Sequence, residues 1–536
     1  MVRRVKGHLT FERFPADYRH WQLVLEPPLA RLSMSVDVNG GMLGDYELKL
    51  NSYDIGVDIE LADIIRRIRF EHPEIKCVVL DSAIEGVFCA GANIRMLAGA
   101  THSHKVNFCK FTNETRLEIE EASAESGLRF LAAINGACSG GGYEVAMACD
   151  HLLLVDDRSS TVSLPEVPLL GVLPGTGGLT RLTDKRHVRR DHADVFATLS
   201  EGMRGADAVA WKLVDEVAPP SAFADAVTVR AMAMAATSDR GGDAVTLAPL
   251  DRTVTDELVS YRYVQAQLDR AGRTVRLSVT ASADRDWPLT CARELDDVLC
   301  HLRFNEPELG TLVVSTIGDA ADVLAHDQML TSPSRHAERE TSLLWKRVLS
   351  RLDLTARTII ATIEPGSCFS GVLAELALAA DRSYMLDGVF EDHDEPLPAA
   401  TIQLTAVSTG PMPMANGLTR LQSRFWGSSH DTPLGTPLVA ADALEAGLVT
   451  FAPDDLDWDD EVRLAIEERA SFSPDALTGM EANHRFAGPE TMATKIFSRL
   501  SAWQNWIFIR PNASGPDGAL RKYGTGSRPT YDINRT

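Results

Sequence analysis

Residues 135–148 read NGACSGGGYEVAMA, a glycine-rich segment from which the predicted architecture follows. An apolar run at 130–134 precedes it and has the composition of a buried strand. After the glycines, residues 143–149 favour a helix, and a further apolar run at 151–155 favours another strand. The glycines therefore mark a tight corner at the start of a helix, where backbone N–H groups have no partner within the helix.

The same alternation of strands and helices occurs earlier in the chain. Residues 30–36 alternate like a strand, apolar residues recur at helical spacing over 57–68, and residues 77–80 form a short buried strand. A helix between two strands at this spacing is a crossover connection, which implies neighbouring parallel strands. The sequence therefore predicts an α/β fold with a mostly parallel sheet.

The chain contains an internal repeat. Three segments of the N-terminal half recur in the same order, at offsets of 375 − 144 = 231, 418 − 179 = 239 and 441 − 206 = 235 residues. The matched pairs are Ser139-Gly140 through Asp150 with Ser370-Gly371 through Asp381, Gly178-Leu179-Thr180-Arg181-Leu182 with Gly417-Leu418-Thr419-Arg420-Leu421, and Ala206-Asp207-Ala208 with Ala441-Asp442-Ala443. The repeat predicts two copies of one α/β unit.

We expect four parts along the chain. They are an N-terminal extension (1–19), a first copy of the unit (20–245), a second copy (250–465) and a C-terminal segment (466–536) that is helical, rich in aromatic residues and ends in a Gly-, Pro- and Ser-containing tail.

The charge of the chain restricts its partners. The 53 basic and 75 acidic residues give a net charge of −22, which argues against nucleic acid and anionic membranes as partners. No apolar run is long enough to span a membrane, and the N-terminus has no signal-peptide core, so we expect a cytoplasmic protein. The eight cysteines show neither disulfide nor metal-site spacing, and buried free thiols are expected.

Two loops could supply an oxyanion hole. In the loop VFCAGANIRML (87–97), small residues let a ligand approach the backbone, so the Ala92 N–H could donate to a carbonyl oxygen, although a plain tight turn fits equally well. The Gly141 N–H, at the glycine-rich corner, could be the second donor. Two such donors would each contribute about 3 to 4 kcal/mol to a transition state.

Two glutamates are the candidate acid and base. Glu144 lies in the first turn of the expected helix, and Glu166 follows a strand and Pro165. Carboxylates that face one pocket can hold a water between them and divide the roles of acid and base. Each glutamate taken alone fits a cap or a surface charge better, and Ser139 or Cys89 as a nucleophile remains an alternative.

Taken in order, these segments resemble the crotonase (enoyl-CoA hydratase/isomerase) superfamily. The matching segments are Cys89 to Ile94, Asn135-Gly136, Gly140 to Ala146, Asp150, Pro165-Glu166, Pro174 to Gly178 and Arg181-Leu182. The resemblance implies a spiral of ββα units that binds an acyl-CoA substrate and uses no metal. It also implies that Ala92 and Gly141 are oxyanion donors, that Glu144 and Glu166 are the acid/base pair, and that Ala90 and Gly140 border the substrate. Asn93 departs from the pattern, which has an aspartate there.

The resemblance also suggests how coenzyme A is held. Lys49 and Arg95 match positions near the nucleotide of coenzyme A, and a local basic patch is needed because the whole chain is acidic. Arg66, Arg67 and Arg69 are further candidates for this patch, and a solvated helix face is an equally good interpretation of them.

The doubled length and the C-terminal segment are similar to a ring-opening branch of the superfamily. This similarity implies hydrolytic opening of 2,3-epoxybenzoyl-CoA with C–C cleavage to 3,4-dehydroadipyl-CoA semialdehyde and formate, without a redox cofactor. Hydration or isomerisation of a linear acyl-CoA, thioester hydrolysis and non-catalytic acyl-CoA binding are the alternatives.

The second copy has lost most of the site. Val372 and Leu373 replace two of the glycines, Glu375 remains at the position of Glu144, and no glutamate matches Glu166. We therefore expect a structural second half in which Glu375 only begins a helix. The sequence leaves open whether the chain is a monomer or a homodimer.

Overall fold

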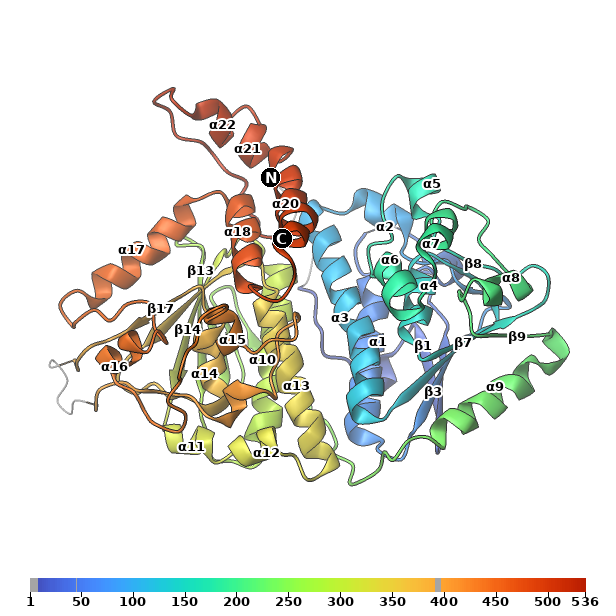
Figure 1. The fold of residues 1–536 in the computed structure, drawn as a ribbon, viewed down its shortest axis with the longest axis horizontal. Helices are drawn as coiled ribbons and strands as arrows, with labels where there is room; N and C mark the ends of the chain where they lie inside the picture. Colours follow the sequence, from blue (N-terminus) through green and yellow to red (C-terminus); the bar gives the residue numbers. More distant parts are fainter. Residues whose placement is uncertain (1–7, 45, 391–396) are drawn as a thin grey trace. The chain divides into compact units, whose positions relative to one another are not determined.

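The computed structural model describes residues 8–44, 46–390 and 397–536, so part of the predicted N-terminal extension lies outside the described residues. The chain divides into two compact units (Figure 1). The N-terminal unit comprises the chain up to Ala248 together with Arg335–Glu340, and the C-terminal unit comprises Pro249–Ser334 and Thr341–Thr536. Each unit contains one large sheet.

The sheet of the N-terminal unit has six strands in the order β1-β2-β3-β5-β7-β9. The first two strands are antiparallel and the others are parallel to their neighbours. Their bounds are β1 Trp21–Glu26, β2 Leu29–Met34, β3 Cys77–Ser82, β5 Arg129–Ile134, β7 His151–Val155 and β9 Glu216–Ala218. The four strands expected at 30–36, 77–80, 130–134 and 151–155 are confirmed, and the mostly parallel α/β architecture with them.

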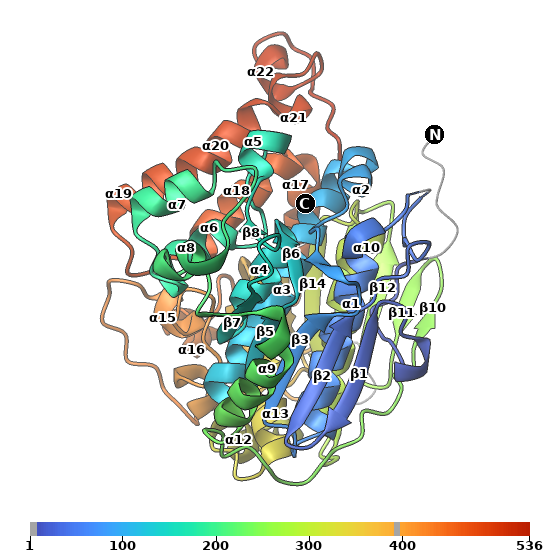
Figure 2. The same cartoon turned by 90° about the vertical axis from the view of Figure 1, so that its right-hand side faces the viewer.

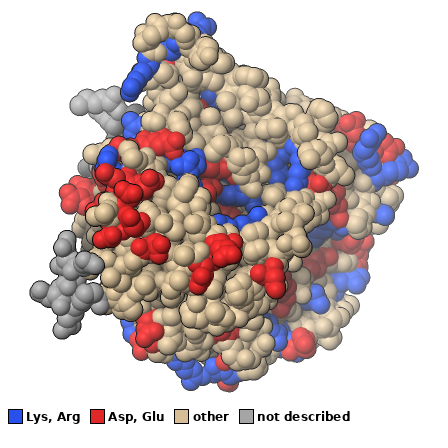
Figure 3. Space-filling view, turned by 60° about the vertical axis from the view of Figure 1, so that its left-hand side comes forward, with Lys and Arg blue, Asp and Glu red and all other residues tan. Residues whose placement is uncertain are grey.

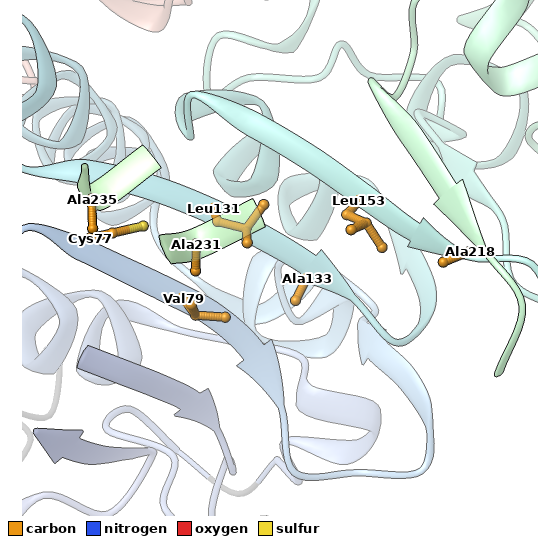
Figure 4. Close-up of a cluster of buried hydrophobic side chains, with 8 residues drawn as sticks. All are labelled: Cys77, Val79, Leu131, Ala133, Leu153, Ala218, Ala231 and Ala235. Carbon is orange, nitrogen blue, oxygen red and sulfur yellow. The ribbon is translucent and has the colours of Figure 1, made fainter. Parts of the chain in front are cut away.

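Helices cover both faces of this sheet (Figures 1 and 2). The helices α1 (Ile55–Glu71), α3 (His102–Ser126) and α4 (Gly141–Ala148) lie on one face, and α9 (Pro220–Ala235) lies on the other. The residues that α9 buries are Ala231 and Ala235, and their small side chains let the helix lie close to the sheet (Figure 4). The remaining residues of this core come from the sheet: Cys77, Val79, Leu131, Ala133, Leu153 and Ala218.

A second, three-stranded parallel sheet holds the glycine-rich corner. It consists of β4 (Gly86–Cys89), β6 (Gly136–Ser139) and β8 (Val162–Ser163). The sequence pattern predicted only a turn before α4, and this was wrong for β6. Gly136 lets the strands approach, because a Cβ atom there would lie 2.3 Å from the Val87 nitrogen. The small sheet brings the loops that follow its three strands together.

The C-terminal unit repeats this architecture with changes. Its sheet has the order β10-β11-β12-β13-β14-β15-β17, in which an antiparallel pair, β12 and β13, is followed by three parallel strands, whereas four parallel strands follow the antiparallel pair of the N-terminal unit. The small sheet is reduced to β16 (Phe369–Ser370) and β18 (Ile402–Gln403), and the described part of this unit has no third strand in it. The strands of the large sheet are β10 Thr253–Val254, β11 Leu258–Ser260, β12 Val264–Asp269, β13 Thr274–Thr280, β14 Thr311–Ile317, β15 Thr358–Ile363 and β17 Arg382–Met385.

The helices of the second part of the chain include a C-terminal helical region, as the sequence predicted. Among them are α10 Trp287–Asn305, α13 His336–Asp353, α14 Gly371–Leu378, α15 Arg420–Arg424, α17 Trp458–Ser471, α18 Pro474–Arg485 and α20 Ser501–Phe508. Clusters of acidic side chains are visible on the face drawn in Figure 3, in keeping with the net charge of −22. Among the described residues, no helix is both long and apolar enough to cross a membrane.

Candidate active site

The loops that follow the strands of the small sheet line one cavity of about 570 Å³ in the N-terminal unit. Six of the predicted site residues line it: Ala90, Ala92, Gly140, Gly141, Glu144 and Glu166. Residues separated by more than 70 positions in the sequence therefore face one space. Lys49 and Arg95, the two residues matched to the coenzyme A nucleotide, do not line this cavity.

The backbone around Ala92 leaves its N–H available to a ligand. Tyr53 donates its N–H to the Gly91 carbonyl at 3.0 Å, and Asn93 donates its N–H to the Tyr53 carbonyl at 2.8 Å. In extended backbone, groups of successive residues point to opposite edges, so the Ala92 N–H points away from Tyr53. Among the described residues, neither the Ala92 N–H nor the Gly141 N–H donates a backbone hydrogen bond.

The two candidate donor loops are in close contact. A Cβ atom on Gly91 would lie 2.8 Å from the Gly141 nitrogen, and Gly91 has φ +83°, which favours glycine. Gly141 begins α4, so its N–H is at the positive end of that helix. The two N–H groups can thus point into one space at the cavity wall, as the stabilisation of an oxyanion requires.

Glu144 is held in place by hydrogen bonds. Its side chain is buried, and Oε1 accepts from the Thr176 N–H at 3.0 Å and from the Gly178 N–H at 2.8 Å. The Thr176 hydroxyl donates to Oε2. An ionised carboxylate only accepts hydrogen bonds, so three donors match the ionised form of Glu144. Thr176 belongs to the PGTGG segment that carried the family resemblance, but no role of its own could be predicted for it from the sequence.

Glu166 has the opposite environment. It begins α5 (Glu166–Leu170), and its buried Oε2 has no hydrogen-bond partner among the described residues. Burial, followed by the negative charge of Glu144, raises the pKa of Glu166 to about 7. Glu166 can therefore gain and lose a proton near neutral pH, which suits an acid/base catalyst.

A buried polar network lies behind the glycine-rich corner. Tyr53 lines the cavity, and its hydroxyl accepts a hydrogen bond from Arg116 at 3.1 Å. Arg116 pairs with Asp58 at 2.8 Å. A Cβ atom on Gly141 would lie 1.9 Å from the Tyr53 oxygen, so only glycine fits there. Burial raises the pKa of Tyr53 well above its usual value, which keeps the phenol neutral. Sequence patterns did not identify this network, since its three members come from separate elements.

The rest of the cavity wall is mainly apolar. Phe108 and the segment after Glu166 form much of it, with Leu169, Leu170, Val172 and Leu173. Lys105 is the one lysine or arginine among the described lining residues, and the sequence analysis had missed it. An apolar chamber with few polar groups is typical of a site for a small organic group.

The remaining candidate cations have other surroundings. Lys49 is exposed and pairs with Glu47 at 2.5 Å, and Arg95 is also exposed. Arg67 pairs with Asp63, and the fully buried Arg69 pairs with Glu340 at 2.6 Å. The prediction that Arg67 and Arg69 belong to a basic patch for coenzyme A is therefore wrong, because carboxylates already pair with both side chains.

Asn93 has a structural role that explains its departure from the family pattern. Its Oδ1 accepts from the Met96 N–H at 3.0 Å and caps α2 (Ile94–Gly99). Its Nδ2 donates to the Glu47 carbonyl at 2.8 Å and to Ser52 at 3.1 Å. An ionised aspartate could make the cap but could not donate these two hydrogen bonds.

The alternative nucleophiles have unsuitable surroundings. Burial raises the pKa of the Cys89 thiol to about 12, and its Sγ donates to the Asn51 carbonyl at 3.1 Å, so it is not a thiolate. Ser139 lines the cavity and accepts a hydrogen bond from Ser163, but no histidine is among the lining residues. All eight cysteines are free thiols, and seven are buried; Cys109 is half-buried and lines the cavity.

The C-terminal unit does not reproduce the site. Glu375, the counterpart of Glu144, is buried and pairs with Arg420 at 3.0 Å. Val372 and Leu373 fill the positions of two glycines with buried side chains. The Glu375 carboxylate is therefore bound by an arginine, whereas the Glu144 carboxylate is bound by two backbone N–H groups and a hydroxyl.

The chain is similar to several known proteins. Residues 47–274 match the enoyl-CoA hydratase/isomerase family model. The chain is 52% identical to a benzoyl-CoA-dihydrodiol lyase from Aromatoleum evansii, over 97% of both chains. An enoyl-CoA hydratase from Geobacillus kaustophilus is 30% identical over 41% of this chain and 75% of its own, with a TM-score of 0.36. One from Bacillus anthracis is 26% identical over 40% and 77%, with a TM-score of 0.34.

Proposed function

Since the chain belongs to the enoyl-CoA hydratase/isomerase family and is a lyase-type enzyme acting on coenzyme A thioesters, we propose that its reaction is the opening of 2,3-epoxybenzoyl-CoA. Two waters are consumed, one ring C–C bond breaks, and the products are 3,4-dehydroadipyl-CoA semialdehyde and formate. The similarity to a benzoyl-CoA-dihydrodiol lyase over 97% of both chains carries this proposal.

The oxyanion donors would act on the thioester. A ring conjugated with the thioester can delocalise negative charge onto the thioester oxygen. The Ala92 and Gly141 N–H groups would stabilise that charge, each by about 3 to 4 kcal/mol. The apolar wall around Phe108 and Leu173 would hold the ring and exclude bulk water, which strengthens these hydrogen bonds.

The two glutamates would have different roles. Glu144, fixed by Thr176 and Gly178, would orient an attacking water and accept its proton. Glu166, whose pKa is about 7, would supply a proton to the oxygen released on ring opening. This division follows from the contrast between a hydrogen-bonded and an unpartnered carboxylate.

The same cavity and glutamates would also suit hydration of a linear enoyl-CoA. The proposed reaction is a hydrolysis with no electron acceptor, so coenzyme A would enter only as part of the substrate. Lys105 at the cavity and the exposed Lys49 and Arg95 are the proposed contacts for its phosphates.

Two substrates separate these functions. The purified chain is incubated with 2,3-epoxybenzoyl-CoA and with crotonyl-CoA, and formate, hydrated product and free thiol are measured. We expect formate from the first substrate, and no formate from Glu144→Gln or Glu166→Gln. Hydration of crotonyl-CoA alone would assign the hydratase reaction instead, and release of free coenzyme A that is lost in Ser139→Ala would assign a thioesterase.

A further inference from the structure

Arg424 is a half-buried cation that forms no ion pair with any carboxylate of the described residues. It ends α15 in the C-terminal unit and lines a cavity of about 210 Å³. Its Nε donates to the Gly447 carbonyl at 2.8 Å, but among the described residues no aspartate or glutamate forms an ion pair with it. A guanidinium at a cavity wall that has no carboxylate partner is able to bind an anion.

The position that matches Arg424 in the N-terminal unit is Lys185, and it has a carboxylate partner. The offset that relates Arg181 to Arg420 also relates Lys185 to Arg424 (420 − 181 = 424 − 185 = 239). In the N-terminal unit, Glu120 of α3 binds Arg181 at 2.8 Å and Lys185 at 2.9 Å. One carboxylate there neutralises two cations.

In the C-terminal unit an aspartate, Asp353, binds the matching arginine, and its side chain is shorter than that of Glu120 by one methylene group. Asp353 of α13 takes both of its hydrogen bonds from Arg420, at 3.0 and 2.6 Å. Asp353 makes no ion pair with Arg424, and the described residues offer no second carboxylate in its place. The ion pair between Glu120 and Lys185 therefore has no equivalent at Arg424 among the described residues.

A second arginine of the same cavity also has an unused donor. Arg469 is 7% exposed, and its buried Nε has no hydrogen-bond partner among the described residues. Its Nη1 lies 3.6 Å from Glu481 Oε1, which is a loose ion pair. Two guanidiniums thus line one space with hydrogen-bonding capacity left over.

Glu375 pairs with the lining Arg420, and Arg535 pairs with the lining Glu481, so the charged residues of the cavity and their partners leave one cation in excess. Four arginines and three carboxylates line it: Arg420, Arg424, Arg469, Arg485, Asp353, Asp381 and Glu481. Asp353 and Asp381 are each bound by two nitrogens of one arginine. The volume of about 210 Å³ is below the roughly 300 to 1,000 Å³ of pockets for larger organic ligands, so only a small ligand fits.

We infer that this cavity is a binding site for a small oxyanion of the phosphate type, held by the guanidiniums of Arg424 and Arg469. Arginine presents paired N–H donors that match the oxygens of phosphate, and the bound anion would supply the charge that Glu120 supplies in the other unit. The site is separate from the cavity that contains Glu144 and Glu166, and it does not depend on the proposed reaction.

Calorimetric titration of the full chain with inorganic phosphate, at an ionic strength kept constant with chloride, tests this site. We expect saturable binding in the wild type and about 10- to 100-fold weaker binding in Arg424→Gln, since hydrogen bonds to charged groups are involved. Arg463→Gln is the matched control, because Arg463 is an exposed arginine of the same unit that pairs with Asp460 and Glu467. This control should bind phosphate like the wild type.

Two results overturn the inference: no saturable phosphate binding, or equal binding by Arg424→Gln and the wild type, which would place phosphate elsewhere. If Arg424→Gln does not fold, crystals of the wild type soaked in selenate replace it. Anomalous density for selenium between Arg424 and Arg469 supports the site, and its absence there refutes it.

Discussion

Glu144 and Glu166 face one cavity, but only Glu144 is tied to the chain, by Thr176 and Gly178. The buried Oε2 of Glu166 has no partner among the described residues. Two identical side chains are thus prepared for different tasks by their neighbours.

The pH dependence of turnover should report Glu166. Its pKa of about 7 means that it is protonated below neutral pH, so a proton donor is lost as the pH rises through about 7. We expect kcat/KM for the ring-opening reaction to fall as the pH rises above about 7. Measurements from about pH 5 to about pH 9 would show this decrease. A profile that stays flat through neutral pH would remove Glu166 from the role of acid.

The stability of the N-terminal unit should also depend on Glu166. The folded-state pKa is raised from 4.5 to about 7, so the stability contributed by the protonated form is complete below about pH 4.5 and is lost as the pH rises through 7. Glu166→Gln should therefore match the wild type at low pH and exceed its unfolding free energy at pH 8 by up to about 3 kcal/mol. Urea unfolding at the two pH values measures the difference; equal stability at pH 8 contradicts the prediction.

Thr176→Val removes the hydroxyl that donates to Glu144 and keeps the shape of the side chain. A hydrogen bond to a charged group contributes about 1.5 to 3 kcal/mol, so kcat should fall roughly 10- to 100-fold. Thr176→Ser keeps the hydroxyl and serves as the control with near-normal kcat. Steady-state kinetics would reject the role of Thr176 if only KM changed.

Gly140→Ala should displace Glu166. The new Cβ atom would lie 2.8 Å from Glu166 Oε1, and Gly140 has φ +55°. A misplacement of about 1 Å can lower a rate about 100-fold, and we expect a loss of that order in kcat. Gly86→Ala is the control, because Gly86 has φ +72° and no atom within 4 Å of its new Cβ. If both variants lose equal activity, backbone strain and not contact with Glu166 is the cause.

Glu375→Gln should affect folding and not catalysis. It leaves Arg420 with one fewer buried carboxylate, and breaking a buried ion pair destabilises by about 3 to 5 kcal/mol. We expect a lower Tm with normal kcat below the transition. Glu468→Gln, which breaks an exposed pair with Arg382, should change Tm little. A loss of kcat in folded Glu375→Gln would assign the second half a part in catalysis.

Much of the fold could be predicted from local patterns. The strands β3, β5 and β7 and the helix α1 follow from apolar runs and helical spacing, and the repeat of the unit is visible in matched segments. The strand β6 was missed because its four residues include a glycine and pair only with short strands that are distant in the sequence. Local composition does not report such pairing.

The site was predictable only in part, for a related reason. Glu144, Glu166 and the two backbone donors lie in motifs, and all of them line one cavity. Tyr53 and Arg116 carry no motif, and their function arises from contact between helices and loops. The loss of a site in the second copy was expected from its missing glycines, but its replacement by an ion pair with Arg420 required the structure.

The Arg420 guanidinium beside Glu375 has a stoichiometric consequence. The chain has two copies of the unit, but in the second copy the ion pair with Arg420 engages the glutamate that matches Glu144. Equilibrium titration with a substrate analogue should therefore saturate at a single equivalent per chain, although the chain carries two copies of the unit.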